Sequence, residues 1–583
     1  MPFQSFRRLG PAAWLVFVAS ASYGQAPIPE ASTYARRWFY SSTNLQVDRA
    51  ADDLIALVDR AGKVGYNGLM LADYKLSILD RVTPGYFANA RRVRAAADAA
   101  GVEIIPAVFP IGYSGGLLAH DPNLAEGMSV EGEPFVVSGR EARPEPFAAP
   151  MFRNGGMEDA KGDRLDGFAF QDDPSAGSFV DEAVHHSGRR SLRFEAGGTS
   201  PNRRVMQSIA VEPHRSYRFS AWIKTKDLQP AGGFRLLVLG SGSPARSLTF
   251  FEGGVERDQD WKQVDVVFNS LDQTRVNAYV GVWSPKGGSV WVDDVAIEPL
   301  GLRNVLRREG CPFVVKSADG KQTYEEGRDF EPVADPRLGR SPWAGEYSFA
   351  HEGPPIRLTA ASRIHDGDSL RVSYYHPVVV HGSQVMCCPS DPKVESLLLD
   401  QARRVNELFH PRTFFMSHDE IRCLNWDRSC LDRGLTPGAI LAKNVERCAA
   451  ILNDVAPGCE IAVWSDMFDP HHNAVKGPYY LVNGSLEGSW LGLPARVTIA
   501  NWNSGKASES LKFFADRGHR QLIAGYYDAD DLSGFTRWNA AARGVPGVDG
   551  FMYTTWERKY RLLEAYGQAM SGAGVTSPPA RKP

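Results

Sequence analysis

The feature that most constrains the fold of this chain is an alternation of strand-like and helix-like patterns that stops and later resumes. Apolar runs at residues 37–42, 68–73 and 102–108 predict strands, and the periodicity of residues 47–64 and 90–100 predicts amphipathic helices. The alternation returns near residue 394, with further strands predicted near residues 411–422, 461–465, 497–502, 522–526 and 550–554. Three strands before the interruption and five after it predict an α/β fold: a (β/α)8 TIM barrel interrupted after its third strand.

The interruption has the pattern of a β-sandwich. Residues 151–300 show no helical period, and their short alternating strands are separated by Gly, Pro and Asn turns. Residues 301–385 form a smaller β-rich segment, which we expect to pack on the barrel as an accessory sheet. The predicted barrel therefore has a first part at residues 30–150 and a second part at residues 386–570, followed by a disordered tail at residues 571–583.

The N-terminus has the pattern of a secretory signal peptide. Arg7 and Arg8 form a basic region, and the apolar run at residues 12–19 is too short to span a bilayer. We expect residues 1–24 to be removed on export to the periplasm or the medium, with no membrane attachment afterwards; a retained N-terminal anchor is the alternative. A net charge of −3 disfavours nucleic acid as a partner, and no pattern indicates an oligomeric state.

The chain has seven cysteines, and export would permit disulfides. Two pairings are suggested by proximity in the sequence: Cys423 with Cys430, and Cys448 with Cys459. The odd count leaves at least one thiol unpaired. A zinc site is the competing interpretation, but no CxxC pair with matching histidines is present. The adjacent Cys387 and Cys388 fit no pattern.

Two adjacent acids, Asp419 and Glu420, stand at the carboxyl end of a predicted barrel strand. Like charges this close raise one pKa, which suits a general acid. Further polar and aromatic groups follow later strands: Trp464 with Asp466, Trp502, Tyr526 with Asp528, and Trp556 with Glu557. Carboxylates beside indole rings suit a pocket that holds and cleaves a sugar. The alternatives are an ion pair between the acids and Arg422, and tryptophans that belong to the barrel core.

The inserted sandwich resembles carbohydrate-binding modules of families 4 and 9. The resemblance rests on Ser187-Gly-Arg-Arg-Ser-Leu-Arg-Phe194 and on the strands at residues 217–225, 261–268 and 290–297. It implies a sandwich fold and a glycan as the partner. It also implies a structural calcium with Glu158 and Asp294 as ligands, since calcium takes oxygen ligands; ordinary surface acids are the alternative.

The second half of the chain resembles glycoside hydrolase family 20, the β-N-acetylhexosaminidases. The first matching segment is residues 408–420, a helix end and a strand that finish with Asp419-Glu420. The other matching residues are Trp464-Ser465-Asp466, Trp502, Tyr526-Tyr527-Asp528 and Trp556-Glu557. The family implies retaining hydrolysis in which the substrate's 2-acetamido group is the nucleophile, with no cofactor in catalysis. Glu420 would be the general acid, Asp419 would orient the acetamido group, and Tyr526 would bond its carbonyl.

The resemblance also implies a substrate-binding set. Its members are His418, Trp464, Asp466, Trp502, Asp528, Trp556 and Glu557. Alternation along a strand favours Tyr526 over Tyr527 as the functional tyrosine. The chain departs from the family, with Phe415 at a usual histidine and no arginine on the first strand that would grip the sugar. Two alternatives follow: a two-carboxylate glycosidase with Asp528 or Glu557 as nucleophile, or an inactive glycan-binding protein.

Overall fold

The structure is a computed structural model that describes residues 34–146, 151–196, 198–242, 245–250, 254–340 and 343–572. The predicted signal peptide and all of the predicted tail except residues 571–572 lie outside the described residues. Within the described part of the chain, no helix combines the length and apolar character that a bilayer crossing requires.

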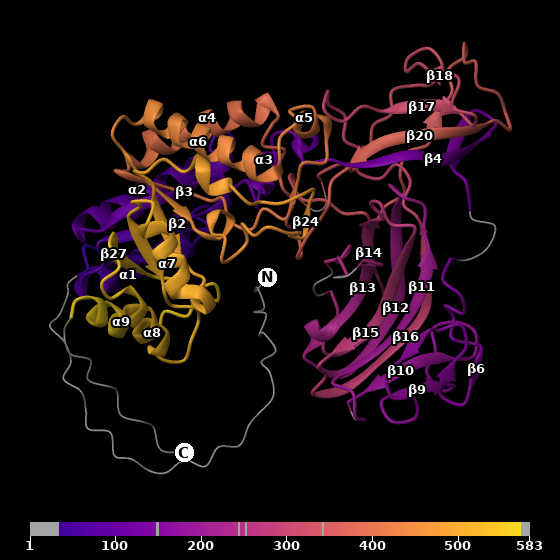
Figure 1. The fold of residues 1–583 in the computed structure, drawn as a ribbon, viewed down its shortest axis with the longest axis horizontal. Coiled ribbons are helices and arrows are strands. Elements are labelled where there is room, and N and C mark those ends of the chain that lie inside the picture. The colour runs from indigo at the N-terminus through magenta and orange to yellow at the C-terminus, as the bar shows by residue number, and fades with distance from the viewer. Residues whose placement is uncertain are drawn as a thin grey trace.

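Eight parallel strands close into a barrel. In barrel order they are β1 (Arg36–Ser42), β2 (Gly68–Ala72), β3 (Glu103–Val108), β21 (Thr413–Met416), β23 (Glu460–Trp464), β25 (Thr498–Asn501), β26 (Gln521–Ala524) and β27 (Val548–Tyr553). Three precede the insertion and five follow it, which confirms the predicted count and the point of interruption. Figure 1 shows the barrel with its indigo and orange-to-yellow parts side by side.

Helices connect most of the barrel strands. They are α1 (Asp48–Lys63), α2 (Pro84–Ala99), α4 (Pro392–Phe409), α6 (Pro437–Val455), α7 (Ala507–Ala515), α8 (Ser533–Ala542) and, after the last strand, α9 (Leu563–Met570). The connection from β23 to β25 differs: it holds the 3-10 turns η4 (Asp466–Phe468) and η5 (Ser489–Gly492) and the short β24 (Leu481–Val482). Strict strand–helix alternation is therefore broken at this point.

Side-chain alternation divides the barrel strands between two cores. Along each strand, alternate side chains point into the barrel. The buried cluster inside the barrel includes Trp38, Met70, Ile105, Phe415, Trp464, Leu522 and Met552. The residues between them, such as Phe39, Phe414 and Phe551, belong to the large core beneath the surrounding helices. The central residues of most barrel strands are apolar because both faces of each strand are buried.

The insertion contains the expected sandwich. A five-stranded sheet follows the order β14 (Gln259–Asn269), β12 (Ser216–Gln229), β16 (Gly287–Pro299), β10 (Ser191–Glu195) and β9 (Ser178–Asp181). A four-stranded sheet follows the order β13 (Phe234–Gly240), β15 (Arg275–Trp283), β11 (Asn202–Ala210) and β8 (Phe170–Gln171). Every strand pairing within the two sheets is antiparallel, as the alternating sequence predicts.

A third sheet corrects the predicted first part of the barrel. Its order is β18 (Thr323–Tyr324), β17 (Val314–Ser317), β20 (Ser369–His376), β4 (Met128–Ser138), β5 (Glu141–Pro144) and β19 (Ile356–Arg357). The segment 128–144, predicted to belong to the barrel, instead pairs with β20 in this accessory sheet. The partner strand follows the whole sandwich in the sequence, so local pattern could not assign the segment; Figure 1 shows β4 and β20 side by side.

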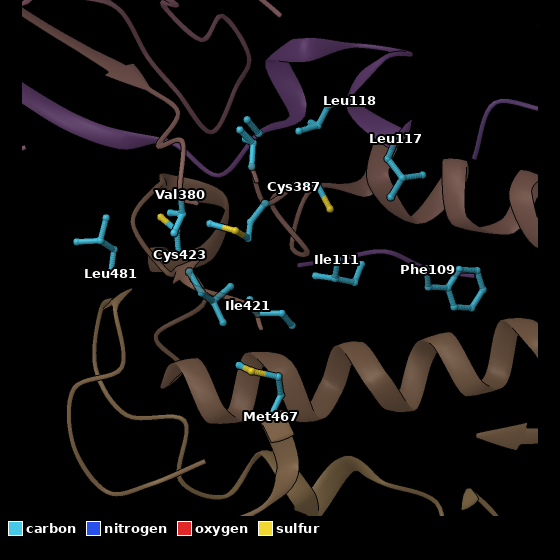
Figure 2. Packing of buried hydrophobic residues seen from close by; sticks show 14 of the residues in the cluster. Phe109, Ile111, Leu117, Leu118, Val380, Cys387, Ile421, Cys423, Met467 and Leu481 are labelled. Atoms are coloured by element: carbon cyan, nitrogen blue, oxygen red, sulfur yellow. The ribbon is translucent and has the colours of Figure 1, made fainter. Parts of the chain in front are cut away.

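The chain on both sides of the insertion packs against the carboxyl ends of β3 and β21. Figure 2 shows Ile111 beyond β3 near Ile421 beyond β21, with Met467 below them in one apolar core. Gly112 is needed here, because a Cβ at this position would lie 2.0 Å from the carbonyl oxygen of Asp419. The insertion thus begins where it can support the predicted acid pair.

Candidate active site at the barrel mouth

The backbone beyond β21 brings three carboxyl groups together. Glu420 has a φ of 50°, a left-handed conformation that is uncommon for a residue with a side chain and often marks functional sites. Its backbone N–H donates to Asp466 Oδ2 at 2.9 Å, and Asp466 follows β23, the next strand in the barrel. Asp419 completes the group. The three acids therefore stand at the carboxyl ends of neighbouring parallel strands, as the sequence predicts.

Burial and mutual repulsion act on two of these acids. Burial raises the pKa of Asp466 to about 7, although it accepts hydrogen bonds from Trp502 Nε1 at 3.3 Å and Asn473 Nδ2 at 3.0 Å. Burial, followed by the charges of Asp466 and Glu420, raises the pKa of Asp419 well above its ordinary value. The raised pKa that the sequence suggested for one acid of the pair is thus found at Asp419.

Glu420 itself is tied by an ion pair. Arg422 Nη2 lies 2.7 Å from Glu420 Oε2, and the Tyr113 hydroxyl donates to the same oxygen. The guanidinium of Arg422 also donates to Gln384 Oε1 at 2.5 Å and lies 4.9 Å from the centre of the Tyr480 ring. The ion pair that the sequence offered as an alternative is therefore present, beside a carboxyl group with a raised pKa.

Aromatic rings border the acids. The Tyr527 ring stacks at 10° on Trp502, with 6.3 Å between centroids, and lies 6.1 Å from the Trp556 ring. Trp502 and Trp556 are partly buried, whereas Trp464 is only 3% exposed and packs among the inward-facing side chains of the barrel. Two of the three predicted tryptophans can therefore form a wall, and Trp464 acts as core beneath them.

The two adjacent tyrosines differ in burial, and the predicted one is the buried one. Tyr526 and Tyr527 do point opposite ways, but Tyr526 is buried, stacks on Tyr553 at 4.1 Å, and donates its hydroxyl to Ala529 O at 2.9 Å. Tyr527 is 49% exposed and lies over the tryptophans. Tyr526 belongs to the layer between barrel and helices because its side of the strand faces Tyr566 of α9.

Three other predicted sugar-binding residues are engaged in contacts within the protein. Asp528 accepts the backbone N–H of Trp556 at 2.9 Å and the Thr555 hydroxyl, so it braces the turn after β27. Glu557 is exposed and pairs with Lys559 at 2.6 Å. His418 is fully buried, with Nε2 at 3.0 Å from Asn444 Oδ1 on α6, and burial lowers its pKa to about 4. Each is occupied by a structural contact.

Sequence reasoning missed several groups around the acids. Tyr113 and Gln384 come from the two ends of the insertion, and no local pattern marks either of them. Tyr40 on β1 is buried, and its pKa is raised by burial and by the charge of Asp419. Alternation along the strand favours Tyr526 and therefore does not indicate Tyr527. Among the groups around the acids, only Arg422 was indicated by the sequence, because it stands two residues after Glu420.

The predicted calcium ligands are already held by protein donors. Glu158 Oε1 accepts the backbone N–H groups of Arg189 at 2.7 Å and Arg190 at 3.2 Å. Asp294 lies 2.6 Å from His186 Nδ1 and accepts the Ser187 hydroxyl at 2.7 Å. The carboxylates tie one loop to the sandwich, and the calcium site stays a prediction.

The predicted disulfides are not formed. All seven cysteines carry free thiols. Cys430 has Cys388 rather than Cys423 as its sulfur neighbour, with 3.6 Å between the Sγ atoms. Cys459 donates to the backbone oxygen of Leu452 at 3.7 Å. Proximity in the sequence was misleading because Cys388 reaches Cys430 from the segment before α4.

Comparison with known proteins supports the sandwich. Residues 149–288 match the family model described as carbohydrate binding domain. A structure described as Family 16 Carbohydrate Binding Module-2 shares 16% identity, with 25% of this chain and 99% of that chain covered and a TM-score of 0.19. A module in complex with β-1,4-galactotriose shares 17%, with 26% and 99% covered and a TM-score of 0.20. The CBM22-1 xylan-binding domain of Paenibacillus barcinonensis Xyn10C shares 12%, with 28% and 97% covered and a TM-score of 0.20.

A carbohydrate-binding domain therefore occupies the inserted sandwich. The match ends before the last sandwich strand, β16, is complete, and it includes none of the barrel. A comparison of the whole sequence with curated proteins found no match.

Proposed function

We propose that this protein is an exported glycoside hydrolase in which the sandwich binds glycan and the barrel mouth cleaves a β-glycosidic bond. The observation that carries the proposal is the pairing of Asp419, whose pKa is raised, with the ion-paired Glu420 beside it. Most glycosidases use one carboxyl group that gives a proton and a second carboxylate, and in substrate-assisted enzymes the 2-acetamido group of the substrate is the nucleophile. The carbohydrate-binding domain at residues 149–288 independently supports a glycan as the partner.

In this proposal the two acids have opposite tasks. Asp419 retains its proton toward neutral pH and is the proton donor to the leaving oxygen. Glu420 pairs with Arg422 and is the carboxylate that stabilises the positive charge developing on the sugar ring. Relative to the roles implied by family 20, the two residues exchange tasks. The buried Asp466 positions Glu420 through its backbone N–H.

The preferred substrate is a β-linked glycan that contains an N-acetylhexosamine, cleaved with retention and with help from the 2-acetamido group. Trp502, Tyr527 and Trp556 supply an apolar border suited to holding the internal nucleophile in position. In this interpretation the barrel is a TIM barrel that works from the carboxyl ends of its strands, with its usual alternation lost between β23 and β25.

Two other functions have observations in their favour. Glu420, next to Asp419 in the chain, is the candidate direct nucleophile on a sugar without an acetamido group, which requires about 5–5.5 Å between the two carboxyl groups. In that case Glu420 takes the role of nucleophile for which Asp528 and Glu557 are the other candidates, since Asp528 bonds the Trp556 backbone and Glu557 pairs with Lys559. A glycan-binding protein without activity is favoured by the Arg422 ion pair and by the Tyr113 hydroxyl, which occupy the Glu420 carboxylate.

The experiment is hydrolysis of aryl β-glycosides with and without a 2-acetamido group. It compares the wild type with Asp419→Asn, Glu420→Gln and the control Glu557→Gln, whose side chain is exposed. Cleavage only of acetamido substrates, lost in the first two variants alone, supports the proposal. Cleavage of plain hexosides makes Glu420 the nucleophile. No cleavage of any substrate, together with glycan binding by the full chain, overturns the hydrolase and leaves a binding protein.

A further inference from the structure

A second cluster of reactive side chains lies buried behind the barrel mouth, where three distant segments meet. Glu126 precedes β4, and Cys388 precedes α4. Asp427 comes directly before the short α5 (Arg428–Leu431), and Cys430 lies within it. All four are buried, and one donor atom from each lies within 4.8 Å of the others. Backbone bonds from Glu126 N to Met386 O at 2.9 Å and from Cys388 N to Leu124 O at 2.8 Å fix two of the segments together.

Three of the distances within the cluster lie close to the edges of a tetrahedron around one ion, and all four donor atoms lie within 4.8 Å of one another. Cys388 Sγ lies 3.6 Å from Cys430 Sγ and 3.4 Å from Asp427 Oδ1, and Cys430 Sγ lies 3.6 Å from Glu126 Oε2. Zinc bonds of about 2.3 Å to sulfur and about 2.0 Å to oxygen at tetrahedral angles give edges of about 3.8 Å between sulfurs and about 3.5 Å between sulfur and oxygen. The donors therefore surround a space of the right size.

We propose that Glu126, Cys388, Asp427 and Cys430 bind a zinc ion as a structural site that joins the insertion to the barrel. Two thiolates select zinc over the hard cations calcium and magnesium. Four protein donors complete the coordination sphere, which is the arrangement of a structural rather than a catalytic zinc. The site is independent of the proposed hydrolase activity.

The second oxygen of each carboxylate is already engaged, as outer-shell contacts around metals require. Glu126 Oε1 accepts the Trp426 N–H at 2.7 Å, which leaves Oε2 facing Cys430. Asp427 Oδ2 pairs with Arg308 Nη2 at 2.5 Å, which leaves Oδ1 facing Cys388. Each carboxylate is thus oriented to present one oxygen to the interior of the cluster.

Electrostatics explains why an ion would be favourable here. Two carboxylates are buried beside Arg308, whose one charge does not balance them. A divalent cation at the centre would balance these buried charges, because it stabilises the deprotonated form of its ligands.

The competing arrangement is a disulfide between Cys388 and Cys430. The present separation of 3.6 Å exceeds a sulfur–sulfur bond of about 2.05 Å. A disulfide is uncharged, so it would leave the carboxylates of Glu126 and Asp427 facing it without a neighbouring positive charge inside the cluster. Zinc accounts for all four side chains, whereas a disulfide accounts for two.

The test is elemental analysis of the full-length protein purified without a metal-affinity step. We expect one zinc per chain, and we expect Cys388→Ser and Asp427→Asn to lose it. The control Cys448→Ser removes a buried thiol on α6 outside the cluster and should keep the metal. After zinc removal, cobalt(II) alone should restore the site and give the absorption of a tetrahedral thiolate complex. Absence of zinc from the wild type together with a Cys388–Cys430 disulfide in non-reducing peptide mapping would overturn the proposal, as would zinc retained by both cluster variants.

Discussion

Arg422 Nη2 lies 2.7 Å from Glu420 Oε2, and this ion pair stands directly beside Asp419 in the chain. The neighbouring charges of Asp466 and Glu420 add to burial in raising the pKa of Asp419. Two residues adjacent in sequence therefore stand in different electrostatic environments. This difference is the basis of the proposed division of labour between them.

Substitution of the proton donor should remove most of the activity. In Asp419→Asn we expect kcat on an aryl β-glycoside to fall by about 10²–10⁴-fold, because that is the usual contribution of general acid catalysis. The loss should be smaller for substrates with a more acidic leaving phenol, which needs less protonation. Steady-state kinetics on a series of leaving groups measures this. An equal loss for every phenol would assign Asp419 a positioning role.

The two tyrosines after β26 should respond in opposite ways. Tyr527→Ala removes a ring from the border of the site, so we expect KM to rise with little change in melting temperature. Tyr526→Phe removes the bond to Ala529 O, so we expect a loss of about 1 kcal/mol in the free energy of unfolding with KM unchanged. Kinetics and denaturant unfolding of both variants separate these effects. A raised KM in Tyr526→Phe would restore the role implied by the family resemblance.

His418 should make the protein sensitive to acid. Burial lowers its pKa from 6.5 to about 4, so the folded state binds a proton less readily than the unfolded chain. Its contribution to stability is therefore complete above pH 6.5 and is lost as the pH falls through about 4, by about 3 kcal/mol at most. In His418→Gln the drop in melting temperature between pH 7 and pH 4.5 should shrink. The exposed His185→Gln is the matched control, and an unchanged drop in His418→Gln would contradict the assignment.

Gly112 should tolerate no side chain. A Cβ there would lie 2.0 Å from Asp419 O, so Gly112→Ala must displace the backbone that carries the acid pair. We expect a loss of about 1–3 kcal/mol in stability, as for overpacked cores, together with reduced activity. Gly287→Ala, whose added carbon would meet no atom within 4 Å, is the control. Thermal unfolding and kinetics measure both variants; normal activity in Gly112→Ala would show that the close approach is not required.

The local periodicity of apolar residues predicted much of the fold. The pattern of apolar residues placed β1, β2 and β3 within one or two residues, because strands buried on both faces are short apolar runs. The same reasoning counted eight barrel strands and located the sandwich. It failed at β4, whose pairing partner β20 lies beyond the whole sandwich.

The sequence by itself determined the strands, the interruption of the barrel and the placing of Asp419 and Glu420 at a strand end, because these depend on neighbours a few residues away. Only the tertiary structure decided that Tyr527 rather than Tyr526 borders the site, and that Arg422 pairs with Glu420. It also brought Glu126 to Cys388 and Cys430. The physical reason is that charge states and contacts depend on burial, and burial is set by segments hundreds of residues apart.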